Sequence, residues 1–312
     1  MRWRATLAVL AVLALCAGAE RAWAAPRVVV TIKPIHALVA AVMAGVGAPE
    51  LLVKGTTSPH VYALKPSDVS AISGADILFR TAAATEPFST TIGRMLPPGA
   101  EFVTLLEAPG VVAFERRTGP DFEAASGSRG EHGHSHAQAL LDGHIWLDPN
   151  NAKAMVARIA EVLAARDPAD APRFNANAAQ LNARLDALAT ELETALAPLA
   201  DKPYVVAHDA YQYFERRFRL KVVGAIALSP ELPPSGKRLA ELRRKIVALG
   251  AICVFAEPEL DRRLIDNLTE GTPARTGTLD PEGFRLEPGP NLYFTLLRKL
   301  AGDLLGCLLP PA

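Results

Sequence analysis

The chain has 312 residues, 50% of them hydrophobic, with 33 basic and 33 acidic side chains. Residues 1–24 contain three arginines and one glutamate, so the remaining 288 residues carry a net charge of −2. Nothing in this balance indicates nucleic-acid binding, which uses a basic patch or stripe. The length fits about two domains of 100–200 residues each.

The N-terminus predicts a secretory signal peptide. Arg2 and Arg4 precede an apolar stretch over residues 5–19, and the small residues Ala22 and Ala24 are typical of a cleavage site. We expect cleavage after Ala24 and export to the periplasm. The stretch is shorter than the roughly 20 residues of a transmembrane helix. No other apolar run is long enough, so no membrane span is expected after cleavage.

Strands and helices alternate through the first half. Runs of β-branched and apolar residues predict strands over 28–32, 51–53, 76–79 and 102–106. The segments 34–43, 66–73 and 87–96 between them are typical of helices. This alternation is the signature of a parallel sheet with covered faces.

A long helix is predicted over about 173–199. Six leucines recur there at steps of three and four: Leu181, Leu185, Leu188, Leu192, Leu196 and Leu199. Pro172 suits the first helical turn and Pro203 stops the helix. At 1.5 Å per residue it would be about 40 Å long. The alternative is a coiled-coil seam for dimerisation, but the run is short for that, so we expect an intramolecular spine in a monomer.

The second half repeats the pattern. Strands are predicted over 204–207, 221–225, 251–255 and 274–278, and the clearest helices over 238–249 and 292–307. We therefore expect an α/β fold with two lobes, joined by one long rigid helix. The expected boundaries are 25–165 for the first lobe with a histidine-containing loop at about 107–143, 166–201 for the connecting helix, and 202–312 for the second lobe.

Two of the three cysteines remain after signal cleavage. Cys253 lies in a predicted strand and Cys307 lies near the C-terminus, and an even pair in an oxidising compartment is most simply a disulfide. Such a bond would add at most about 4 kcal/mol on the chain-entropy model. The alternatives are two free thiols or an intermolecular bridge. Cys16 follows Leu15, which is too large for a lipoprotein signal, so lipid anchoring is not expected.

Four residues form a candidate metal site: His60, His144, His208 and Asp280. Three imidazoles and one carboxylate make a closed tetrahedral shell that suits zinc. All but His144 follow predicted strands, and ligands of open parallel sheets bind beyond the carboxyl ends of the strands. We expect two ligands from each lobe, with the ion between the lobes. His36 lies inside a predicted helix and is interpreted as a packing residue or as a residue that supports a ligand.

A second histidine cluster lies in the sequence Glu131-His132-Gly133-His134-Ser135-His136, after a stretch rich in glycine and serine. This alternation suits a tract that captures metal loosely, so His132, His134 and His136 are predicted to be auxiliary, low-affinity ligands. The alternative is a disordered linker that happens to contain histidine.

Ordered motifs along the whole mature chain resemble one family. They are 31–36 (TIKPIH), 58–68 (SPHVYALKPSD), 142–149 (DGHIWLDP), 208–211 (HDAY), 255–258 (FAEP) and 277–281 (GTLDP). The chain is similar to the periplasmic solute-binding proteins of zinc ABC importers, of the cluster A-1 type. The resemblance implies two lobes, each with a four-stranded sheet, a His-rich loop near the site and delivery to a membrane permease. It also implies zinc as the bound ion and His60, His144, His208 and Asp280 as its ligands.

Other functions stay open at this stage. Some zinc-binding relatives have an acidic residue beside the first histidine, where this chain has Ser58 and Pro59. Related manganese binders place a carboxylate at the position of His208, so a manganese or other divalent-metal protein is the alternative, although imidazole favours zinc. A zinc hydrolase is less favoured, because Asp280 would close the shell and no HExxH or GxSxG motif is present. An adhesin or structural module that uses the ion only for stability is a third class.

Overall fold

We describe a computed structural model that covers residues 25–117, 140–227, 235–248, 250–259 and 262–309. The predicted signal peptide and the predicted auxiliary ligands His132, His134 and His136 lie outside these residues. Within the described residues, no helix has the length and apolarity needed to cross a membrane.

A parallel four-stranded sheet forms the first half of the fold, with strand order β2-β1-β3-β4. Its elements are β1 (Val28–Val30), α2 (Lys33–Val42), β2 (Glu50–Leu51), α3 (Pro66–Ser73), β3 (Ile77–Arg80), the 3₁₀ helix η2 (Pro87–Arg94), β4 (Glu101–Thr104) and the 3₁₀ helix η3 (Leu105–Glu107). The predicted elements are present, but residues 87–94 form a 3₁₀ helix, the first strand ends at Val30 and not at residue 32, and the second covers Glu50–Leu51 and not 51–53. The predicted fourth strand is also too long, because its last residues turn into η3.

The second sheet is also parallel and four-stranded, with the equivalent order β6-β5-β7-β8. Its elements are β5 (Pro203–His208), α7 (Gln212–Phe218), β6 (Lys221–Ala227), α8 (Gly236–Ala248), β7 (Cys253–Ala256), α9 (Arg262–Thr269), β8 (Arg275–Thr278) and α10 (Leu292–Leu308). The predicted α/β fold with two parallel sheets is therefore confirmed.

Between the sheets, the chain forms a helical hairpin. The 3₁₀ helix η4 (Ile145–Leu147) leads into α5 (Pro149–Arg166), which packs along α6 (Ala171–Leu196) and its 3₁₀ extension η5 (Ala197–Leu199). The long helix is confirmed, but α5 was not predicted. Its apolar face includes several alanines, so its periodicity is weaker than the leucine row of α6. Asp148 accepts a hydrogen bond from the backbone N–H of Asn150 and so caps α5.

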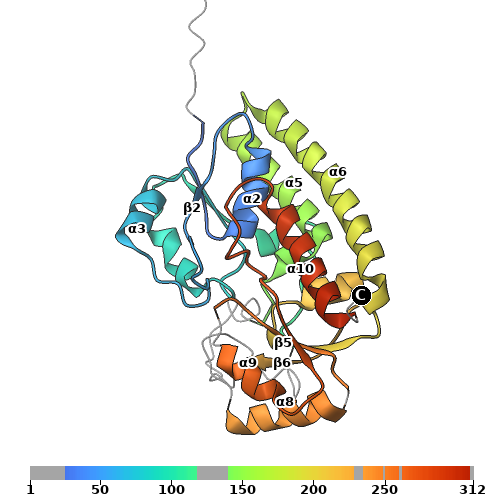
Figure 1. The fold of residues 1–312 in the computed structure, drawn as a ribbon. Coiled ribbons are helices and arrows are strands. Elements are labelled where there is room, and N and C mark those ends of the chain that lie inside the picture. The colour runs from blue at the N-terminus through green and yellow to red at the C-terminus, as the bar shows by residue number, and fades with distance from the viewer. Residues whose placement is uncertain (1–24, 118–139, 228–234, 249, 260–261, 310–312) are drawn as a thin grey trace, which may run out of the picture.

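One continuous core joins the two halves. The largest buried cluster contains residues of β1 and β3, of β5 and β7, and of α2, α5, α6 and α10. Figure 1 shows these four helices side by side along one side of the molecule. Smaller clusters cover the other face of each sheet, under α3 and η2 in the first half and under α8 and α9 in the second. The two sheets are therefore joined through one packed core that includes these helices.

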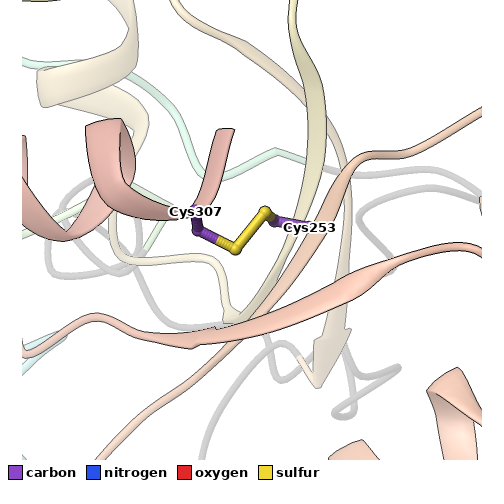
Figure 2. The surroundings of a disulfide bond; sticks show 2 residues. All are labelled: Cys253 and Cys307. Atoms are coloured by element: carbon purple, nitrogen blue, oxygen red, sulfur yellow. A yellow bond between two sulfur atoms is a disulfide. The ribbon is translucent and has the colours of Figure 1, made fainter. Parts of the chain in front are cut away.

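The predicted disulfide between Cys253 and Cys307 is confirmed, with a Cα–Cα distance of 6.2 Å. Figure 2 shows it joining the end of α10 to strand β7. It closes a loop that contains α9, β8 and the turn that follows β8. The loop includes Asp280, so this part of the second sheet is tied covalently to the common core.

Candidate metal centre

Three of the four predicted ligands lie together. His208 is the last residue of β5, His144 directly precedes η4, and His60 lies in the loop between β2 and α3. One nitrogen from each imidazole lies within 4.8 Å of the others. His144 and His208 are buried, and His60 is half-buried. The structure therefore brings together side chains from both halves of the chain.

The distances between the imidazoles match a metal shell. Nε2 of His144 is 3.3 Å from Nε2 of His60 and 3.4 Å from Nε2 of His208. Two ligands of a tetrahedral zinc ion with bonds of about 2.0–2.1 Å are about 3.3 Å apart. The fit is with nitrogen atoms alone, which favours zinc and other metals that prefer imidazole.

Two buried carboxylates hold the outer nitrogens of these rings. Asp142 accepts a hydrogen bond from Nδ1 of His144 at 2.7 Å, and Glu257 accepts one from Nδ1 of His208 at 2.8 Å. The Tyr211 hydroxyl also donates to Glu257. A donor at Nδ1 leaves the lone pair of a neutral imidazole at Nε2, so both rings present lone pairs to the same point.

Neither carboxylate was assigned a role from the sequence. Glu257 follows β7 directly, at the sheet edge where β5 ends in His208, so the strand-end argument applied to His208 would have found it. For Asp142 the signals were its position two residues before His144 and its place at the start of the motif 142–149. The backbone N–H of Asp142 donates to the carbonyl of Phe114, and its carboxylate also accepts a hydrogen bond from the backbone N–H of His144.

The environment separates the three histidines in their pKa values. Burial, followed by the neighbouring imidazoles, lowers the pKa of His60 well below its usual value, and burial and His208 do the same for His144. Burial also acts to lower the pKa of His208. The charge and hydrogen bond of Glu257 outweigh that effect, so the pKa of His208 is raised. Two of the rings are therefore neutral at pH 7 without a metal, and His208 holds its proton most strongly.

Close packing fixes the loop that carries His144. A Cβ atom on Gly143 would lie 2.8 Å from the Thr85 hydroxyl and 3.0 Å from Ala82. Only glycine therefore fits between Asp142 and His144. Residues 81–86 follow β3, so the first sheet supports His144 even though that residue comes from a distant part of the chain.

Asp280, the fourth predicted ligand, is buried beyond the end of β8, but its oxygens are not part of the three-histidine group. Its carboxylate accepts hydrogen bonds from the backbone N–H groups of Phe284 and Arg285. Lys33 of the first half lies against the same turn and donates to three carbonyls, those of Gly283, Phe284 and Leu286. The turn that carries Asp280 is therefore held from the opposite half of the molecule.

An ion-pair network lies beside the centre. Arg117 contacts the carboxylates of Asp209, the residue after His208, and of Glu215 in α7. The same stretch of chain pairs with residues 140–142 through an antiparallel bridge between Glu115 and Leu141. The chain therefore pairs with itself on either side of the segment that contains the predicted auxiliary histidines, next to His144 and His208.

Comparison with known proteins agrees with this centre. Residues 28–307 match the family described as "Zinc-uptake complex component A periplasmic". The chain is 42% identical over 321 residues to the "High-affinity zinc uptake system protein ZnuA" of Brucella abortus (strain 2308), with 96% of each chain covered. The chain belongs to the ZnuA family. The ZnuA protein of Paracoccus denitrificans is 37% identical, again with 96% of each chain covered.

Solved structures share the fold of this ZnuA-family chain. The solute-binding protein FpvC from Pseudomonas aeruginosa, in complex with Mn2+, superposes with a TM-score of 0.77 at 20% identity, covering 91% of this chain and 98% of that one. The resemblance found in the sequence motifs is therefore confirmed at the level of family and fold. The family description also agrees with the periplasmic location predicted from the signal peptide.

Proposed function

We propose that this chain is a high-affinity periplasmic zinc-binding protein that captures Zn2+ between its two sheets and delivers it to the permease of an ABC transporter. Membership of the ZnuA family and the zinc uptake for which its relatives are named support this proposal. Delivery to the permease rests on the family alone.

One observation carries the metal binding. Asp142 and Glu257 fix Nδ1 of His144 and His208 as donors, so the two Nε2 lone pairs face each other at 3.4 Å. When both rings are neutral these lone pairs repel, and either a proton on His208 or a buried metal cation between the rings removes the repulsion. We expect His60 to complete this nitrogen set from the loop after β2.

We propose Asp280 as the fourth ligand. An ionised carboxylate has about four lone-pair positions, so two backbone hydrogen bonds leave room for a metal bond. Asp280→Asn tests this assignment, because the amide keeps the shape and an acceptor oxygen but loses the charge. We expect the zinc affinity to fall about tenfold or more. Unchanged affinity would show that the fourth ligand is another group.

Competitive titration of residues 25–312 with zinc and manganese tests the proposed cargo. Three imidazoles favour zinc, whereas manganese prefers shells rich in carboxylates. We expect one tight zinc equivalent that manganese does not displace. Preference for manganese would overturn the metal assignment, and tight binding of neither metal would overturn the site.

The remaining predictions are part of the same proposal. We propose that the protein is a monomer. We also propose that it has no catalytic activity, because a shell closed by a fourth protein ligand leaves no position for a substrate. We also propose a first lobe of residues 25–165, a connecting helix of residues 166–201 and a second lobe of residues 202–312. Deletion of residues 126–137 should remove only weak metal binding, because His132, His134 and His136 are proposed as auxiliary ligands. Loss of the tight site in that variant would contradict this role.

A further inference from the structure

Strand β8 has one open edge. It is the last strand of the second sheet and, among the described residues, it pairs only with β7. The backbone N–H groups of Arg275 and Leu279 donate to carbonyls on the β7 side. In a parallel strand, the backbone N–H and C=O groups of alternate residues point to opposite edges. Those of Thr276 and Thr278 therefore point away from β7. Both threonines are exposed.

A cavity lies on each face of this edge. One has a volume of about 370 Å³ and is bordered by Arg275 and by α10 residues that include Gly302 and Gly306. A Cβ atom on either glycine would meet nothing, which leaves this face of α10 open. The other cavity is about 170 Å³ and lies against α9, and Arg285 borders both. Space for alternating side chains is what an added strand requires.

The charge along the edge is positive. In the described part of the chain, the guanidinium groups of Arg275 and Arg285 have no hydrogen-bond or ion-pair partner, and Arg285 is exposed. The carboxylates around the cavities are already engaged. Asp303 pairs with Lys299, Asp280 accepts backbone N–H groups, and Glu257 holds the His208 ring.

We propose that β8 is a docking edge for an extended, acidic peptide segment of a partner protein. The segment would pair with the outward backbone groups of Thr276 and Thr278, and its carboxylates would contact Arg275 and Arg285. A second copy of this chain is a poor occupant, because two β8 edges would bring the same arginines together. The proposal does not depend on zinc binding, since neither arginine belongs to the metal centre.

Charged residues on an edge strand have another use, which is to prevent association. The two roles make opposite predictions for an added peptide. A docking edge binds an acidic strand and rejects a basic one, whereas a protective edge binds neither. The probe is therefore an acetylated, fluorescein-labelled octapeptide of alternating glutamate and threonine, compared with the same peptide carrying lysine for glutamate.

Fluorescence anisotropy with the zinc-loaded protein measures the binding. We expect a Kd of about 100 μM or tighter for the acidic peptide, and none up to about 1 mM for the lysine peptide. Thr276→Pro removes only an outward N–H, at a position where an edge strand tolerates proline, and should weaken binding at least about tenfold. The matched control Thr276→Val keeps the N–H and should bind as the native chain does. Zinc titration shows that each variant is folded.

Arg275→Gln with Arg285→Gln should also weaken binding and reduce its dependence on salt. Three results would overturn the proposal. They are no binding of the acidic peptide, equal binding of both peptides, and binding that Thr276→Pro leaves unchanged. Sedimentation velocity adds one more, because self-association that is lost in Thr276→Pro would identify the edge as a contact between copies.

Discussion

The two sheets have the same strand order but support the metal centre in different ways. In the second sheet, His208 ends β5 and Glu257 follows β7, its hydrogen-bonded neighbour. The proposed ligand and the carboxylate that orients it are thus positioned by the sheet itself. On the side of the first sheet, His60 and His144 lie in loops. Their positions depend on contacts of the loops themselves, such as the bond from the His60 N–H to the Ser58 hydroxyl and the packing of Gly143 against Thr85 and Ala82.

Removing one histidine from each side should give the largest effects. His208→Ala and His60→Ala are both expected to weaken zinc binding about 100-fold or more, because a ligand contributes more than a group that acts through it. Their stabilities should differ. His208→Ala leaves Glu257 buried without its imidazole partner and should lower the free energy of unfolding of the metal-free protein, whereas His60 lies in a half-buried loop.

Competitive zinc titration and chemical denaturation of both variants measure these two effects. His36→Asn is the control, because His36 bonds the carbonyl of Pro49 and is not part of the three-histidine group. It should leave the zinc affinity unchanged. Equal losses of stability in His208→Ala and His60→Ala would show that the histidine at the strand end contributes no more to stability than the histidine in the loop.

The carboxylates should give the next largest effects. Glu257→Gln and Asp142→Asn keep the shapes of the side chains but remove the charges that fix Nδ1 of His208 and His144. Loss of such a partner typically costs about 10–100-fold in metal affinity. We expect the larger loss for Glu257→Gln, because Glu257 makes two contacts with its ring and accepts the Tyr211 hydroxyl as well. A larger loss for Asp142→Asn would reverse the comparison.

The pH dependence of zinc binding should report mainly on His208. Burial lowers the pKa of His60 and His144, so neither holds a proton near pH 6.5, whereas Glu257 keeps the pKa of His208 raised. Zinc must displace the His208 proton, so affinity should fall as the pH drops through that pKa, by about tenfold per pH unit. Zinc titrations between about pH 8 and 6 measure the slope. A slope that corresponds to three displaced protons would contradict the assignment of the pH dependence to His208.

Much of this centre can be predicted from the sequence. Parallel strands place their carboxyl ends at one edge, so His208 and Asp280 could be assigned to that edge from strand patterns alone. The same rule also places Glu257 there, because it directly follows β7. The long helix α6 could also be predicted, from the spacing of its leucines. The disulfide Cys253–Cys307 could be predicted because two cysteines in an oxidising compartment usually pair.

Other features depend on packing between distant segments and have no local signal. Helix α5 buries small alanines and is recognised only against α6. The choice of Gly143 reflects Thr85, far away in the sequence, and the contact of Lys33 with residues 283–286 spans both halves. Such contacts have no spacing rule. The turn bonds of Asp280 are a further example, because strand patterns predict its edge but not the direction of its carboxylate.

The contact of Lys33 with the Asp280 turn should give the smallest effect on affinity and the clearest effect on motion. Lys33→Met keeps the length of the side chain but leaves the buried carbonyls of Gly283 and Phe284 without their donor. We expect the free energy of unfolding to fall by about 2–3 kcal/mol. Hydrogen exchange within residues 280–286 should increase, while zinc affinity falls less than about tenfold, because no histidine is displaced.

Lys153→Met is the matched control, because its exposed pair with Asp186 contributes at most about 1 kcal/mol. If the exchange of this turn were unchanged in Lys33→Met, the common core alone would hold the two halves together, and the ammonium group would serve only to compensate nearby charges such as Asp280 and Glu287.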